Sequence, residues 1–263
     1  MTNKILKTKK SFFFILLAIC GGFYAFAGPT TTQAPSAQVV WVKGTVTDVS
    51  SGNGPRVLKR RDAVYQQDSI VTNATSSGEI VFSDGGLMTV SPGSTIRVSE
   101  YKFTGGNSSG DKSVIDVAKG GFRAITGAIS KADPSAYQVR TPVATIGVRG
   151  TDFTVYYKTC AHLKKGEDCG LATKISKGGI IIENGLGRVV LLDGSNQTFA
   201  MVGSATTTPT ISSQAPDTVS NDVSIQSAIF GGSDLGTPIP PSFDSGSAGA
   251  AGPTQQVGGF CIQ

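Results

Sequence analysis

Short runs of alternating apolar and polar residues, separated by turn residues, fill the chain between residues 39 and 203. Because side chains alternate between the two faces of a β-strand, this pattern predicts many short strands. No segment before residue 204 keeps the 3.6-residue period of an amphipathic helix. We therefore predict an all-β sandwich or β-roll of short, mostly antiparallel strands, with a short parallel β-solenoid as the alternative.

The most clearly predicted hairpin runs from Gly78 to Val90, with Asp84-Gly85-Gly86 at its turn. Asn184-Gly185 predicts a second hairpin, between strands over residues 179–183 and 187–192. Further strands are expected over the remaining apolar runs, at residues 39–46, 68–72, 95–98, 114–117, 122–125, 137–139 and 197–202.

The positions of the apolar residues change parity in the middle of the chain. They are odd-numbered from Tyr137 to Thr141, even-numbered from Ala144 to Val148 and odd-numbered again from Phe153. Such a change needs one extra residue or a sharp bend, and Gly150 or Gly147 can take the positive φ that a bend requires. A similar change at Pro142 predicts a second corner. The chain is therefore expected to leave one sheet and join another in this region.

The segment Thr141-Pro-Val-Ala-Thr-Ile-Gly-Val-Arg-Gly-Thr-Asp-Phe153 resembles the signature of the FecR domain, an extracytoplasmic module of bacterial envelope proteins. Residues 42–46, 68–72, 82–86 and 120–123 resemble other strands and turns of that family, so the resemblance covers residues 39 to 203. Regulators of this family carry a cytoplasmic segment that controls a sigma factor. Only about ten residues precede the apolar N-terminal segment here, so we do not expect that role.

Residues 1–27 are organised like a secretory signal peptide, with a basic start, an apolar run over residues 12–19 and Ala25-Phe26-Ala27 at the cleavage site. The protein is therefore expected to be periplasmic or secreted. An uncleaved anchor is the alternative, and membrane contact is expected only if this segment is retained. Residues 28–38 are predicted to be a mobile lead-in. Residues 204–263 are predicted to be a low-complexity tail with at most one short helix, over residues 217–230.

The net charge argues against nucleic acid as a partner. The whole chain has a formal charge of +5, and removal of the four lysines of the signal segment leaves about +1. Nucleic-acid binding needs a broad positive surface, which this composition does not supply.

Cys160 and Cys169 are predicted to form a disulfide in an oxidising compartment. The alternative is a metal site that also uses His162 and Asp168. Because the chain has one histidine and the spacing is irregular, we expect neither a metal nor another cofactor. The state of Cys261 is left open.

No nucleophile-and-base motif is recognisable, so an enzyme is not expected. Asp84, Asp116, Asp152 and Asp193 could include a carboxylate pair, but two of them belong to turns, where Asp binds backbone donors.

Arg149 and Asp152 are the candidate binding residues. Their structural interpretation is an ion pair that holds the corner, and their functional interpretation is a surface for a partner or an anionic group. Trp41, the only tryptophan, is expected in the core, with a ligand platform as the alternative.

The leading functional hypothesis is recognition of an envelope protein or a cell-wall glycan through loops and exposed strand edges. The alternatives are a component of an extracytoplasmic signalling system related to FecR-type iron-uptake regulation, and a structural or adhesive surface protein.

Overall fold

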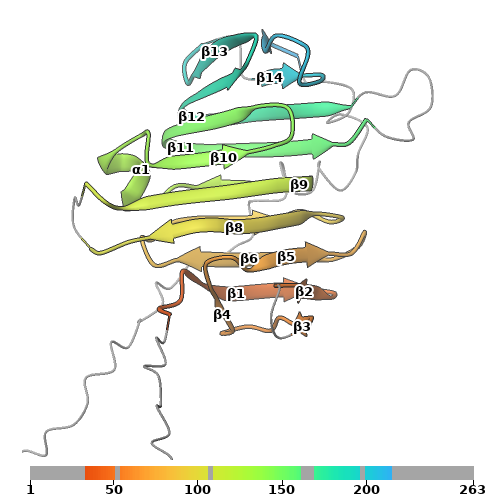
Figure 1. Cartoon of the computed structure of the whole chain (residues 1–263), viewed down its shortest axis with the longest axis vertical. Helices are drawn as coiled ribbons and strands as arrows, with labels where there is room; N and C mark the ends of the chain where they lie inside the picture. The colour runs from red at the N-terminus through yellow and green to blue at the C-terminus, as the bar shows by residue number, and fades with distance from the viewer. Residues whose placement is uncertain (1–32, 51–53, 106–108, 161–168, 196–198, 215–263) are drawn as a thin grey trace, which may run out of the picture. The chain divides into compact units, whose positions relative to one another are not determined.

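The computed structural model describes residues 33–50, 54–105, 109–160, 169–195 and 199–214 (Figure 1). The predicted signal segment, residues 28–32 of the lead-in, His162, Asp168, Cys261 and the predicted helix over residues 217–230 lie outside these residues. Within them, no helix is long and apolar enough to cross a membrane.

The described residues form a single hydrogen-bonded sheet of fifteen strands and one short helix, which confirms the predicted all-β class. The helix, α1 (Ala128–Ala132), was not predicted. The strands are β1 (Ala37–Lys43), β2 (Val46–Asp48), β3 (Arg56–Val57), β4 (Ala63–Val64), β5 (Ser69–Thr72), β6 (Ser77–Phe82), β7 (Leu87–Val90), β8 (Thr95–Lys102), β9 (Lys112–Ile125), β10 (Tyr137–Arg140), β11 (Thr145–Lys158), β12 (Gly170–Asn184), β13 (Gly187–Leu192), β14 (Phe199–Val202) and β15 (Thr210–Ser212).

The strands pair antiparallel, as predicted, and both predicted hairpins form, as β6–β7 and β12–β13. Among the described strands, β9 and β10 are the one parallel pair. The alternative of a parallel solenoid is therefore wrong, because a parallel solenoid stacks its strands in parallel throughout.

Three long strands bend and take part in two regions of the sheet. The first half of β9 pairs with β8 and β10, and its second half pairs with β7 and β11. In the same way, β12 pairs with β14 before its bend and with β13 after it, whereas β11 pairs with β9 after its bend. Figure 1 shows β9 in the middle of the stack, with β11 and β12 between it and the end that carries β13. The inward side chains of the two regions form one core, in which Phe122 and Phe153 are fully buried.

The bends occur at Gly120, Gly150 and Gly178, whose φ angles are 71°, 54° and 85°. A residue other than glycine is strained in this left-handed region. At two of these glycines space excludes other residues as well, since a Cβ atom on Gly120 would lie 2.6 Å from the Cα of Ser94, and one on Gly178 would lie 2.5 Å from the carbonyl oxygen of Gly150. The two runs predicted on either side of Gly120-Gly121 are thus one bent strand.

The parity change between Val148 and Phe153 has its predicted cause. The register of β11 against β12 shifts between Arg149 and Asp152, at the bend. The prediction of a second corner at Pro142 is wrong. Residues 141–144 make a tight hairpin turn instead, closed by a 3.0 Å bond from Thr141 N to the oxygen of Ala144.

The β structure extends beyond the expected boundaries at both ends. Ser36 is buried and β1 begins at Ala37, inside the segment predicted as a mobile lead-in. At the other end, β15 pairs with β14 although the tail was predicted to begin at residue 204.

Candidate binding surface

Four large apolar side chains are exposed on β13, on β15 and in the turn before β13. They are Leu186 (53% exposed), Val190 (48%), Leu192 (56%) and Ile211 (37%). Figure 1 shows β13 at one end of the stack of strands. Single exposed apolar residues are ordinary on protein surfaces, but a group of them marks an interaction site. We call Leu186, Arg188, Val190 and Leu192 the β13 edge surface.

The alternation of side chains along β13 explains the exposure of this surface. Arg188, Val190 and Leu192 are exposed, whereas Leu191 is buried in the core and Val189 is half-buried. The strand is apolar on its outer face as well as on its inner face. The fold does not need Val190 and Leu192 for its core, so their apolar side chains are available to a partner.

The backbone of β13 has an open edge. Antiparallel pairing engages every second residue with the neighbouring strand. The Asn184–Gly187 pair closes the two-residue hairpin, and the N–H of Asp193 donates to the oxygen of Gly178 at 2.8 Å. The N–H and C=O groups of the odd-numbered residues of β13 therefore point toward β12. The N–H and C=O groups of Arg188, Val190 and Leu192 consequently point away from β12.

Within the described chain, β13 pairs with β12 and with no other strand. One of the outward groups is engaged locally, because Ser195 Oγ donates to the oxygen of Leu192 at 2.7 Å. The remaining N–H and C=O groups of Arg188 and Val190 and the N–H of Leu192 form a row of donors and acceptors.

Two arginines flank the apolar pair on the same face. Arg188 lies opposite Glu183 of β12, and Leu192 lies opposite Gly179, which lies opposite Arg149 of β11. The Leu192 side chain covers Gly179 closely, since a Cβ atom there would lie 2.7 Å from Leu192 Cδ2. Among the described residues, neither Arg149 nor Arg188 forms a salt bridge.

The predicted ion pair between Arg149 and Asp152 is wrong. Asp152 pairs instead with Arg123 of β9, whose Nε and Nη2 donate to its two carboxylate oxygens at 3.0 and 2.8 Å. Both side chains are partly buried, and the bidentate contact raises the pKa of Arg123. Arg149 is exposed on the part of β11 that precedes the bend, whereas Asp152 follows the bend. The structure thus separates the two candidates: Asp152 joins β11 to β9, and Arg149 lies on the outer face.

Hydroxyl groups hold the corner in which Arg149 was expected to act. Thr151 Oγ1 lies 2.8 Å from the oxygen of Gly179 and accepts from the N–H of Gly179 at 3.3 Å. Ser130 Oγ donates to the oxygen of Val148 at 2.8 Å and accepts from the N–H of Gly150 at 2.9 Å. These contacts satisfy backbone groups that the bend removes from the regular ladder.

Asp84 fixes the β6–β7 turn against the start of α1. Its carboxylate accepts from the N–H groups of Gly86 at 3.0 Å and Ile129 at 3.3 Å, and its own N–H donates to the Tyr101 hydroxyl at 2.9 Å. Burial raises the pKa of Asp84 and also raises the pKa of Tyr101 and of Tyr137 nearby. Asp84 and Tyr101 hold the turn in place, which is a structural role.

The four aspartates considered as a possible carboxylate pair have separate partners. Asp84 and Asp152 are described above, Asp116 accepts from Ser99 Oγ, and Asp193 accepts from the N–H of Gly178 at 2.8 Å. The part of the chain that the structure describes contains no group of three or more metal-ligating side chains.

Trp41 lies at a different place from the one predicted. It is 41% exposed on β1, next to a register shift between Val39 and Trp41, and is not in the core.

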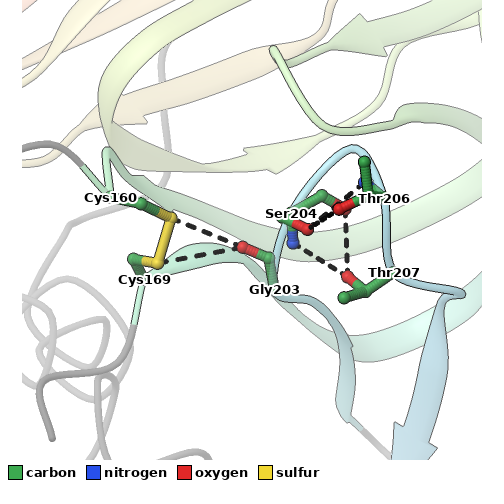
Figure 2. Close-up of a disulfide and its surroundings, with 6 residues drawn as sticks. All are labelled: Cys160, Cys169, Gly203, Ser204, Thr206 and Thr207. Atoms are coloured by element: carbon green, nitrogen blue, oxygen red, sulfur yellow. Dashed lines mark hydrogen bonds between the residues drawn. A yellow bond between two sulfur atoms is a disulfide. The ribbon is translucent and has the colours of Figure 1, made fainter.

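Cys160 and Cys169 form a disulfide with an S–S distance of 2.05 Å (Figure 2). Both sulfur atoms approach the oxygen of Gly203, at 3.5 Å from Cys160 and 3.8 Å from Cys169. Neither sulfur carries a proton in the disulfide, so these contacts are not hydrogen bonds. The bridge joins the end of β11 to the start of β12 and places both beside the residue that follows β14.

The residues of the β13 edge surface were not singled out from the sequence. The signal that could have revealed them is Arg188-Val189-Val190-Leu191-Leu192, in which apolar residues occupy both faces of one strand. Such a run is also typical of a strand buried on both faces, and only the position of β13 at an edge distinguishes the two cases.

Solved structures and one protein family are similar to this chain, and the family match identifies the domain. Two crystal structures, at 1.65 Å and 2.50 Å resolution, of a candidate anti-sigma factor from Parabacteroides distasonis ATCC 8503 are similar to this chain at 16% identity and a TM-score of 0.42. Each match covers 58% of this chain and 62% of the other, less than two thirds of the length of those proteins. No curated protein matches the chain. The profile of the family described as "FecR protein" matches residues 68–166, which include the β6–β7 hairpin and the bend of β11, and this chain therefore carries a FecR domain.

Proposed function

We propose that this protein is a non-enzymatic recognition module that acts outside the cytoplasm, as a component of a signalling system, and binds an envelope protein. The FecR domain supports the signalling role. Export is supported by the signal-like N-terminal sequence and by the disulfide, since disulfides persist in oxidising compartments. The non-enzymatic role is supported by the lack of a recognisable nucleophile-and-base motif in the sequence.

The β13 edge surface is the observation that carries this proposal. Val190 and Leu192 expose about half of their area, beside a row of backbone donors and acceptors that β12 does not use. Water must be displaced from these side chains when a partner covers them, which gives a favourable free energy of binding. A surface of this kind suits a protein partner better than a glycan, which needs mainly polar contacts and aromatic platforms.

The test is capture of partners from envelope fractions with the whole chain and with two variants. Leu192→Glu places a charge on the β13 edge surface. Val57→Glu is the matched control, because Val57 is equally exposed (56%) on β3, a different edge strand. We expect one defined envelope protein to be retained by the wild type and by Val57→Glu, and to be lost with Leu192→Glu.

Two results would contradict the proposal. Recovery of cell-wall glycan alone would exclude a protein as the partner. Fractionation that finds the wild-type chain in the cytosol would exclude the extracytoplasmic role.

A further inference from the structure

We propose that the partner binds as an additional antiparallel β-strand on the open edge of β13. Its side chains would be apolar opposite Leu192 and Val190 and acidic opposite Arg188. The inference rests on the proposed function, that this chain binds a protein, and adds where and in what conformation the partner binds.

The length of β13 distinguishes it from the other edge strands of the described sheet. β13 has six residues, whereas β3 and β4 have two each and β15 has three. Six residues extend over about 20 Å, enough for several inter-strand hydrogen bonds. Proteins often keep their edge strands short, which prevents pairing with other chains. β13 is too long to be protected in this way.

Proline, lysine and a bulge, which also protect edge strands, are absent from β13, and Arg188 is its one charged residue. Its sequence, Gly187-Arg-Val-Val-Leu-Leu192, has no proline and no lysine, and its register against β12 has no bulge. The outward N–H and C=O groups of Arg188 and Val190 are therefore arranged to form a new ladder. A strand added there gains main-chain hydrogen bonds, and its alternate side chains determine specificity.

The composition of the added strand follows from cross-strand pairing. Residues directly opposite each other on one face of an antiparallel pair are in contact. An apolar residue opposite Leu192 would be followed two positions later by one opposite Val190. A carboxylate would follow after two more positions, opposite Arg188. Arg149 adds positive charge on the same face, in line with Leu192. The expected motif is thus apolar-x-apolar-x-acidic, read from N- to C-terminus.

Charge complementarity favours such a peptide over a second copy of this chain. Two β13 strands paired around a two-fold axis at Val190 would place each Arg188 opposite a Leu192 of the other copy. This arrangement brings two Arg149 and two Arg188 side chains into one interface with only two Glu183 carboxylates, and it adds no carboxylate to the added strand. A partner with an acidic residue at the third position satisfies Arg188 directly.

The test measures binding of a synthetic ten-residue peptide by fluorescence anisotropy to the whole chain. The peptide has valine at two alternate positions, glutamate two positions further on, and threonine elsewhere. A second peptide has lysine in place of the glutamate. We expect the glutamate peptide to bind the wild type more tightly than the lysine peptide by about five- to tenfold, and Arg188→Glu to reverse this preference.

Val190→Pro tests the backbone contribution. Of the backbone hydrogen-bonding groups, proline removes only the N–H of Val190, which points to the open edge and not to β12. It also replaces the valine side chain, for which Val190→Ala is the comparison. We expect Val190→Pro to bind the peptide about tenfold more weakly or worse, and Val190→Ala to lose less, because it keeps the N–H. Val57→Pro, on β3, is the control and should bind as the wild type does. Near-UV circular dichroism checks that each variant is folded.

Amide hydrogen exchange provides a direct measurement of strand addition. The amides of Arg188, Val190 and Leu192 should exchange more slowly when the glutamate peptide or the captured envelope protein is bound. If the envelope protein is captured through Leu192 but these amides are not protected and Val190→Pro has no effect, strand addition is wrong while the proposed function stands. If no envelope protein is captured, the proposed function fails whatever the peptide does.

Two further outcomes would overturn the inference. Equal binding of the glutamate and lysine peptides would contradict the acidic position. A wild-type dimer in sedimentation that Val190→Pro dissociates would assign the edge to a second copy of this chain.

Discussion

Arg123 and Asp152 form a bidentate ion pair that joins β9 to β11 next to the bend of β11, with hydrogen bonds of 3.0 and 2.8 Å. Arg149, three positions before Asp152, contributes nothing to it. Arg149 is thus close to Asp152 in sequence, whereas Arg123 is the arginine that binds it in space. The two arginines have different roles. This difference can be measured.

Arg123→Ala should lower the free energy of unfolding by about 1–3 kcal/mol, because it removes two charge-assisted hydrogen bonds and leaves a partly buried carboxylate without its partner. Arg149→Ala, on the exposed outer face, should change it by less than about 0.5 kcal/mol. Urea unfolding of the two variants provides the comparison. Equal losses would show that Arg149 also supports the corner.

Gly120→Ala should destabilise the protein by about 2–4 kcal/mol, since alanine is strained at a φ of 71° and its Cβ atom would clash with the backbone at Ser94. Gly147→Ala is the matched control. A Cβ atom there meets nothing within 4 Å, so this variant should be unchanged or more stable by up to about 1 kcal/mol. Thermal unfolding followed by circular dichroism measures both. A tolerated Gly120→Ala would show that the bend of β9 does not depend on this glycine.

Glu79→Gln should change the pH dependence of stability. Glu79 is buried on β6, where Thr89 Oγ1 donates to its carboxylate at 3.3 Å, and burial raises its pKa above the ordinary value of 4.5. Because the folded-state pKa is the higher one, the stability that this group contributes is present below pH 4.5 and is lost as the pH rises through the folded-state pKa. Glutamine does not titrate and can still accept from Thr89.

The free energy of unfolding of Glu79→Gln, relative to the wild type, should therefore increase from pH 4 to pH 8. Asp68 and Asp84 also have pKa values raised by burial, but they are present in both proteins and cancel in the difference. Urea unfolding at several pH values gives this difference directly. A difference that is constant with pH would show that Glu79 is not desolvated in the folded protein.

Replacing both Cys160 and Cys169 with serine should lower the free energy of unfolding by about 2–3 kcal/mol, the loop-closure contribution expected for a sequence separation of nine residues. Reduction of the wild type with dithiothreitol should produce a similar loss and should leave the serine variant unchanged. If the reductant destabilises both proteins equally, its effect does not come from this bridge.

The repetition of short alternating runs in the sequence determined the all-β class, the antiparallel pairing and both hairpins. These features depend on the two-residue period of a strand and on turn residues such as Asn184-Gly185, which act over a few positions along the chain. The bend at Gly150 was also predictable, since a parity change can be read directly from the order of the residues. Pro142 shows the limit of that inference, because a tight hairpin changes parity as a bend does.

Only the tertiary structure decided which side chains meet and which remain exposed. Arg123 is 29 residues before Asp152, and no local pattern indicates that it lies closer to that carboxylate than Arg149 does. The apolar run at Val190 and Leu192 would be buried in a central strand and is exposed because β13 lies at an edge. The sequence specifies the tendency of each segment to be extended, whereas contacts between distant segments, and therefore the free edge available to a partner, depend on how the whole sheet is ordered.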